Sequence, residues 1–234
     1  MPNMNIISKN IIEIRYKPDP QILDIKGKIV QYLTNSSKFF DTWNITGNDI
    51  TLVSTKNKNL RAFFTFKRWA LESINPISDD DFIQASTEII QNSSSLINID
   101  KITRLGVRST YIIGTELTFN DLLKEMNGKI SKFDTTKISN KLIDTAFTFT
   151  FAEDNNKVNI SFGPMSDEQI KENFIDSKDL PKNGLFVDID TYCSKFEKQL
   201  KTKDIVSFLK DAIKNGRGKA ITIFESLNLK DAKK

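Results

Sequence analysis

Two runs of strictly alternating residues limit the folds open to this chain more than any other feature. Between residues 145 and 162, apolar and polar side chains alternate on both sides of a polar turn at 153–157. Alternation with a period of two indicates strands, and the short turn joins them as an antiparallel hairpin. We expect one face of this hairpin to belong to the core. That face carries Phe147, Phe149, Phe151, Val158, Ile160 and Phe162.

The remaining elements mix strands and helices without the regular alternation of a parallel sheet. The predicted strands cover 10–17, 43–45, 50–53, 60–74, 101–113 and 184–192. The predicted helices cover 20–34 and 194–227 and begin also at Ser78, Thr118 and Ser166, with a loop at 127–141. Because strands and helices follow one another irregularly, we expect an α+β fold. It combines a mostly antiparallel sheet, flanking helices and a long C-terminal helix.

The C-terminal helix is predicted to pass through a glycine-rich segment. Its apolar stripe keeps one phase from Ile205 to Leu227, across the sequence Asn215-Gly-Arg-Gly. A stripe that stays in phase indicates one continuous or merely kinked helix. We therefore expect Gly216 to lie at a point of close packing.

The composition limits the chemistry available. The 234 residues contain no histidine and one cysteine, Cys193, so the commonest general base and metal ligand is absent and a zinc-cysteine site or intrachain disulfide is excluded. We expect no catalytic residues and no cofactor, with Mg²⁺ as the alternative. The length suits a single domain over 1–234, or two lobes at about 1–115 and 116–234.

The charge is nearly balanced. The chain carries a formal +4, spread evenly between its halves, although residues 191–234 hold 11 basic and 5 acidic side chains. No signal peptide is recognisable at the N-terminus and no apolar stretch reaches the length of a membrane span. We expect a cytoplasmic protein that does not bind membranes.

The first segment whose side chains could bind a ligand or take part in a reaction is the strand around Asp188 and Asp190. Residues two apart on a strand share a face, so both carboxylates point the same way. Such a pair can hold Mg²⁺ through its oxygens. The alternative is that both pair with Lys or Arg on an exposed strand end. A metal-dependent reaction also needs a third acid or base, for which Glu13, Glu153 and Glu197 are the candidates.

The second segment, Arg104 to Arg108, places two guanidiniums on one strand face with Gly106 between them. Paired arginines suit a phosphate or carboxylate, and the glycine leaves room for a close approach to the backbone. We expect either anion binding by Arg104, Gly106 and Arg108, or cross-strand ion pairs, for example with Glu13.

The third segment is 61–69. If it is one strand, Arg61, Lys67 and Trp69 share a face with Phe63 and form a cationic aromatic surface. Such a surface suits single-stranded nucleic acid. The alternative is that the rings on one face of the strand fill the core and those on the other face pack under a helix.

Three segments together resemble a sporadically distributed family of uncharacterised prokaryotic proteins. They are Ile-Ile-Glu-Ile-Arg-Tyr-Lys-Pro at 11–18, Thr-Arg-Leu-Gly-Val-Arg at 103–108, and Asp-Ile-Asp-Thr-Tyr at 188–192 ahead of the C-terminal helix. The chain has Ser109 where this family usually has Tyr, and Ile113 where it has Asn. The resemblance implies a prokaryotic protein and carries no established activity.

These features leave three functional hypotheses. The first is a non-catalytic binding or scaffold protein that recognises a protein partner or a small anionic ligand. The second is a Mg²⁺-dependent enzyme acting on a phosphate-containing substrate through Asp188 and Asp190. The third is a single-stranded nucleic-acid binder. The first needs the fewest additional residues, and the sequence leaves the oligomeric state open.

Overall fold

The computed structural model describes residues 4–94, 96, 102–131, 135–138, 142–175, 177–196 and 200–229. In these residues, nine antiparallel strands form one sheet in the order β2-β3-β4-β5-β1-β6-β9-β8-β7. The strands are β1 (Ile6–Tyr16), β2 (Thr42–Thr46), β3 (Asp49–Val53), β4 (Leu60–Phe64), β5 (Arg68–Ile74), β6 (Ile102–Gly114), β7 (Phe147–Glu153), β8 (Asn156–Ser166) and β9 (Asn183–Cys193). The sheet and its helices confirm the predicted α+β fold.

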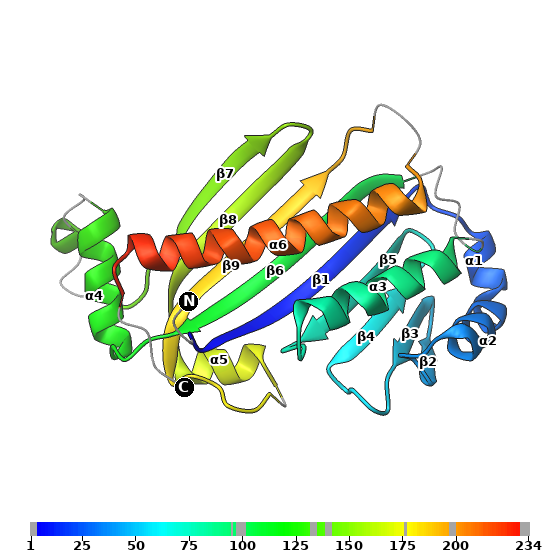
Figure 1. Ribbon diagram of the computed structural model, residues 1–234, viewed down its shortest axis with the longest axis horizontal. Helices are drawn as coiled ribbons and strands as arrows, with labels where there is room; N and C mark the ends of the chain where they lie inside the picture. The colour runs from blue at the N-terminus through cyan, green and yellow to red at the C-terminus, as the bar shows by residue number, and fades with distance from the viewer. Residues whose placement is uncertain are drawn as a thin grey trace.

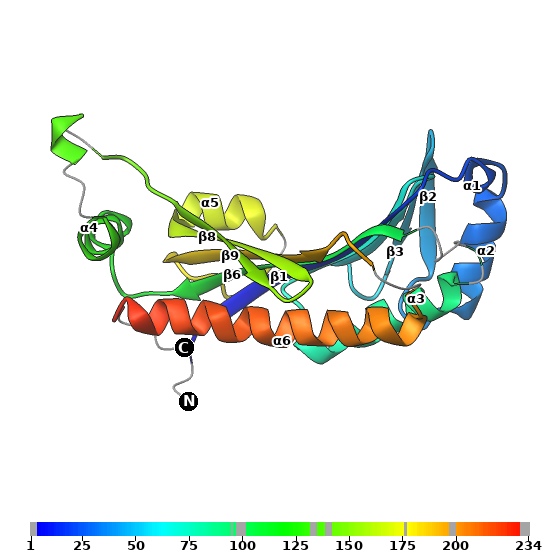
Figure 2. The same cartoon turned by 90° about the horizontal axis from the view of Figure 1, so that it is seen from above.

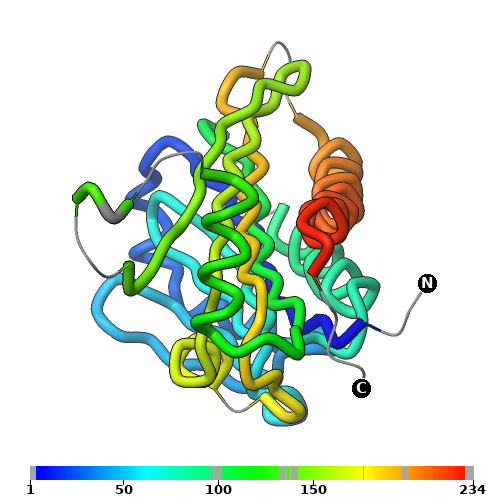
Figure 3. Tube along the Cα trace, turned by 90° about the vertical axis from the view of Figure 1, so that its left-hand side faces the viewer, coloured from blue at the N-terminus to red at the C-terminus, as the bar shows by residue number. Residues whose placement is uncertain are grey.

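Helices cover one face of the sheet far more than the other. Two long helices, α3 (Asp79–Ser93) and α6 (Thr202–Ser226), lie along the same face (Figures 1 and 2). The end-on view shows α6 on one side of the strands (Figure 3). The short α5 (Asp167–Asn173) lies on the opposite face, where Ile170 and Phe174 pack against Ile7 and Ile112. We call the side of α3 and α6 the helical face, and the other side the open face.

The remaining helices are α1 (Gln21–Asp24), α2 (Lys26–Ser36) and α4 (Phe119–Ile130). Ile29 and Leu33 of α2 join the core of β1–β5, and Leu122 and Met126 of α4 join the core of β8 and β9. Ser78 and Thr118 each cap the N-terminus of a helix, where the side-chain oxygen accepts a hydrogen bond from a backbone N–H of the first turn. Both helices were predicted to begin at these residues. Within the described residues, no helix combines the length and the apolar character needed to cross a membrane.

The two halves of the chain repeat one topology. In the first half, β1 is followed by helices, by strands that include the meander β3-β4-β5, and by α3. In the second half, β6 is followed by α4, by the meander β7-β8-β9 and by α6, with α5 inserted between β8 and β9. The strands β1 and β6 pair antiparallel at the centre of the sheet, so the sheet order is nearly symmetric about this pair. The centre is therefore where both halves contribute side chains to the same face.

The single strand predicted over 60–74 is wrong. The chain turns at 65–67, and β4 and β5 pair antiparallel, with Phe64 opposite Trp69. Thr65 makes this turn, because its side-chain oxygen accepts hydrogen bonds from the backbone N–H groups of Lys67 and Arg68. A short polar turn in a run of apolar residues gives little periodic signal, which is why the pattern resembles one strand.

The C-terminal helix is continuous, as predicted. It runs through Gly216 and Gly218 and begins at Thr202, eight residues later than expected. A Cβ at Gly216 would lie 3.5 Å from the Tyr111 hydroxyl oxygen, so the helix packs closely on β6 at this point. The helix predicted over 20–34 is instead divided at Ile25 into α1 and α2, and the loop predicted over 127–141 holds the last turn of α4 and a 3-10 turn at Thr135–Lys137.

The hairpin of β7 and β8 is confirmed, but part of its apolar face is not core. Val158, Ile160 and Phe162 on β8 are buried, whereas Phe149 and Phe151 on β7 remain 44% and 45% exposed. Phe149 and Phe151 remain exposed because β7 is the last strand of the sheet and has a neighbouring strand on only one side.

Candidate functional site

Alternation brings the two predicted charged pairs onto the same face. Arg104 and Arg108 lie on β6, Asp188 and Asp190 lie on β9, and these two strands are neighbours. In their register, Arg108 is opposite Asp190 and Thr110 is opposite Asp188. All four side chains belong to the open face, because the alternating positions face the helices: Ser109 and Tyr111 on β6 pack against Gly216 of α6, and Ile189 lies between the two aspartates in the core on that side. The hypothesis of a Mg²⁺-dependent enzyme placed Arg104 and Arg108 beside the two aspartates as phosphate clamps, but no local pattern shows that the two strands are adjacent.

Arg104 bridges two acids from different strands. Its Nη1 lies 3.0 Å from Glu13 Oε1 on β1, and its Nη2 lies 2.9 Å from Asp190 Oδ2 on β9. The guanidinium also lies over the ring of Tyr192, 4.6 Å from the ring centroid. This arrangement explains Gly106, because a Cβ there would lie 2.9 Å from Arg104 Nη1. The group that approaches the glycine is the neighbouring arginine of the same strand.

Arg108 and Asp188 form the second pair. The Arg108 Nε donates to both carboxylate oxygens of Asp188 at 2.9 and 3.0 Å, and the Thr110 hydroxyl donates to the same carboxylate at 2.7 Å. Asp188 is buried, whereas more than half of the Arg108 side chain is exposed. The aspartate therefore anchors the inner part of the guanidinium and leaves its outer part accessible to solvent.

Glu13 also pairs with Arg15 and Arg68, which were not among the predicted site residues. Arg15 Nε lies 2.7 Å from Glu13 Oε1, and Arg68 Nη1 lies 3.6 Å from Glu13 Oε2. Arg15 is two residues from Glu13 on one strand, so its presence on this face could be read from the alternation. Arg68 could not, because the turn at 65–67 changes the face on which each residue of that segment lies. Both side chains are about half exposed.

We call these residues the arginine face. They are four guanidiniums (Arg15, Arg68, Arg104 and Arg108) and three carboxylates (Glu13, Asp188 and Asp190). Each carboxylate is shielded by at least one guanidinium, and one positive charge remains in excess. The expected cross-strand pairing with Glu13 is present, on the same residues as the predicted anion site.

Burial and charge oppose each other at Asp190. Burial raises the pKa of Asp190 above its usual value, and this effect outweighs the opposing attraction of Arg104 and Arg108. At Arg108 the hydrogen bond to Asp188 is the main cause of a raised pKa, which keeps the guanidinium charged at every physiological pH. Arg108 therefore stays charged, whereas burial makes Asp190 easier to protonate.

The acids of this face are not arranged as a metal cluster. Both aspartates hold guanidiniums, and among the described residues no three His, Cys, Asp or Glu side chains come together. Glu13 and Glu153 were two candidates for a third acid beside the aspartate pair. Glu13 is linked to Asp190 by Arg104, which pairs with both, and Glu153 pairs with Lys219 of α6 at 3.1 Å. Glu197 lies outside the described residues.

The three predicted nucleic-acid residues do not share a face. Trp69 is 1% exposed and its ring packs edge-on against Phe64, with the centroids 6.0 Å apart, so it cannot stack on a base. Lys67 lies in the turn between β4 and β5, and Arg61 is exposed on β4. The alternative prediction, that the rings fill the core, is confirmed for Trp69 and Phe64.

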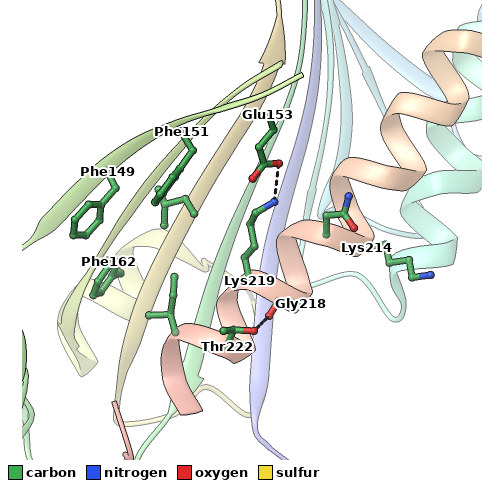
Figure 4. A pocket seen from close by; sticks show the side chains of 11 residues that line it. Phe149, Phe151, Glu153, Phe162, Lys214, Gly218, Lys219 and Thr222 are labelled. Carbon is green, nitrogen blue, oxygen red and sulfur yellow. Dashed lines mark hydrogen bonds and ion pairs between the residues drawn. The ribbon is translucent and has the colours of Figure 1, made fainter. Parts of the chain in front are cut away.

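A second feature, which the sequence did not reveal, is an apolar groove between the β7–β8 hairpin and α6. Its volume is about 720 Å³ (Figure 4). Phe149, Phe151 and Phe162 form its wall on the hairpin, and Lys214 and Thr222 lie on the helix opposite. The ion pair of Lys219 with Glu153 links the two sides.

Comparison with known proteins assigns no relatives. No protein-family model matches the chain, and the search of curated proteins found no significant similarity.

Proposed function

We propose that this protein is a non-catalytic binding protein whose arginine face takes an anionic ligand with phosphate or carboxylate chemistry. The observation that carries this proposal is the set of three half-exposed guanidiniums, Arg15, Arg68 and Arg108, around the central Arg104. Arginine presents its donors in a rigid fork that fits two oxygens of a phosphate or a carboxylate at once. A polyvalent anion can therefore bridge several of these side chains.

The internal carboxylates support the proposal by holding the arginines in place. Four like charges on neighbouring strands repel one another, and side chains of this length lose much conformational freedom when they are fixed. Glu13, Asp188 and Asp190 offset the repulsion and restrict the guanidiniums before any ligand arrives. Binding then costs less entropy, which is the advantage of a preorganised site.

The same contacts favour binding over catalysis. A reaction on a phosphate needs a free carboxylate, a metal or another base beside the bound group. The two aspartates instead hold Arg104 and Arg108, and the chain has no histidine. The arginine face can hold an anion but offers no evident group to transform it.

Thermal unfolding with inorganic pyrophosphate tests this function. A ligand at one hundred times its Kd stabilises the folded state by about 2.7 kcal/mol, which raises the Tm of a chain of this size by roughly 5–10 °C. We expect that rise in the wild type and most of it to be lost in the double variant Arg15→Gln, Arg108→Gln.

A control for the loss of positive charge alone is Lys124→Gln, at an exposed position of α4. We expect this variant to respond to pyrophosphate like the wild type. Equal Tm shifts in the wild type and the double arginine variant would contradict the proposal, and so would the absence of any shift in the wild type.

A further inference from the structure

The edge strand β7 lacks the features that keep sheet edges from pairing. Its sequence, Phe-Thr-Phe-Thr-Phe-Ala-Glu, contains no lysine, proline or glycine. Its pairing with β8 is regular over all seven residues, without a bulge. In the part of the chain that the structure describes, no element covers the outer side of this strand (Figure 1). A long edge of this kind is a template for a further strand.

The turn between β7 and β8 determines which backbone groups face outward. Glu153 is paired with Asn156, so the loop has two residues and closes on a hydrogen-bonded pair. Hydrogen-bonded pairs recur every second residue, which directs the backbone N–H and C=O of Phe149 and Phe151 towards β8. The N–H and C=O groups of Thr148, Thr150 and Ala152 therefore point away from the sheet. These three residues are exposed.

We propose that the edge of β7 pairs with β7 of a second copy of this chain, antiparallel about a two-fold axis at Thr150. In this register, Thr150 of the two copies form a hydrogen-bonded pair, and Thr148 pairs with Ala152. All the outward backbone groups of the strand are then satisfied. The two nine-stranded sheets become one continuous sheet.

The side chains are self-complementary in the same register. Phe149 of each copy lies opposite Phe151 of the other, in a non-hydrogen-bonded pair, where opposed side chains approach most closely. The four rings lie on the helical face, beside the apolar groove of each copy. Because these two rings are close to half exposed, pairing removes apolar surface that the isolated chain leaves in water.

Charge does not oppose this contact. The acid of β7, Glu153, lies at the end of the strand and is already paired with Lys219 of its own α6. In the proposed register it lies opposite Phe147, and the two copies of Glu153 are at opposite ends of the paired segment. An acidic partner strand would gain nothing from an edge without basic residues, which favours a second copy over a charged peptide.

The size of the contact predicts a reversible dimer. Four aromatic rings of ~200 Å² each, close to half exposed, would lose roughly 350 Å² of apolar surface. Together with the backbone pairing, this is small beside the 1,200–2,000 Å² that a standard stable interface buries. We therefore expect monomer and dimer to exchange, with a Kd in the micromolar range.

Sedimentation velocity tests the proposal over about a hundredfold concentration range around micromolar. We expect the wild type to shift from monomer to dimer. The substitutions Thr150→Lys and Thr150→Glu place like charges at the two-fold axis, so each variant alone should stay monomeric. An equimolar mixture of the two should again form a dimer, because opposite charges then meet at residue 150.

The control is Asn44→Lys at the centre of β2, the other edge strand, which should dimerise like the wild type. Circular dichroism checks that every variant is folded. A wild type that is monomeric at all concentrations would overturn the proposal. Dimerisation of each Thr150 variant alone, or failure of their mixture to dimerise, would overturn it as well.

Discussion

Asp190 has a mixed environment, in which burial favours the neutral carboxyl and two arginines favour the charged one. The balance raises the pKa of this group above 3.8. The folded state then binds a proton more tightly than the unfolded chain, so ionisation of Asp190 reduces the free energy of unfolding as pH rises from the unfolded pKa through the folded pKa. Asp190 is therefore held in the arginine face at a cost in stability, which is common for groups that serve binding.

Arg104→Gln should raise the pKa of Asp190 further, because it removes the nearest opposing charge and leaves the burial unchanged. The carboxyl carbon resonance of Asp190, followed by NMR through a pH titration, measures this directly. Arg61→Gln is the control on the same sheet, since Arg61 makes its hydrogen bond to the Lys58 carbonyl and not to this cluster. A pKa that falls or stays constant in Arg104→Gln would show that Arg104 does not govern this carboxyl.

At the scale of elements, β7 shows that the burial of residues in one alternating pattern depends on the position of their strand in the sheet. Phe149 and Phe162 belong to the same alternating pattern, and their rings stack with centroids 6.0 Å apart. Phe162 is 7% exposed, whereas Phe149 on the edge strand is 44% exposed. We expect Phe162→Ala to cost about 3–5 kcal/mol and Phe149→Ala clearly less, because its ring is only partly removed from water.

Urea unfolding of the two variants at a concentration where the chain is monomeric gives both values from one kind of measurement. Equal losses would mean that β7 is packed as deeply as β8.

The same comparison shows what sequence could predict. Caps, alternation and stripe phase are local patterns, so the sequence predicts β1, the start of α3, β6, the β7–β8 hairpin and the continuity of α6. The bounds are less accurate, because β1 begins at Ile6 and not at residue 10, and α6 begins at Thr202 and not at residue 194. The order of strands depends on contacts between distant residues, which no local pattern records. The meeting of Arg104 with Glu13 and Asp190, the burial of Trp69 and the exposure of Phe151 all follow from that order.

At the scale of the whole molecule, the repeated topology places the arginine face where the two halves meet. Glu13 and Arg15 come from the central strand of the first half, Arg104 and Arg108 from the central strand of the second. The long helices α3 and α6 lie on the other face, and α5 packs on the open face against Ile7 and Ile112. Arg15 and Arg108 remain about half exposed, so a ligand can reach them. Anion binding at the centre and pairing at the β7 edge use separate surfaces, which lets one be tested without the other.

The most direct test of the account is an NMR titration that follows the arginine Nε–Hε signals during addition of inorganic pyrophosphate. We expect the largest, saturable shifts at Arg15, Arg68 and Arg108, and a binding constant that weakens as salt is added, as for any contact between exposed charges. Shifts confined to Arg61 or to Arg217, which lies on α6 and pairs with Asp79 of α3, would contradict the proposed function if the signals of the arginine face stayed unchanged at saturation.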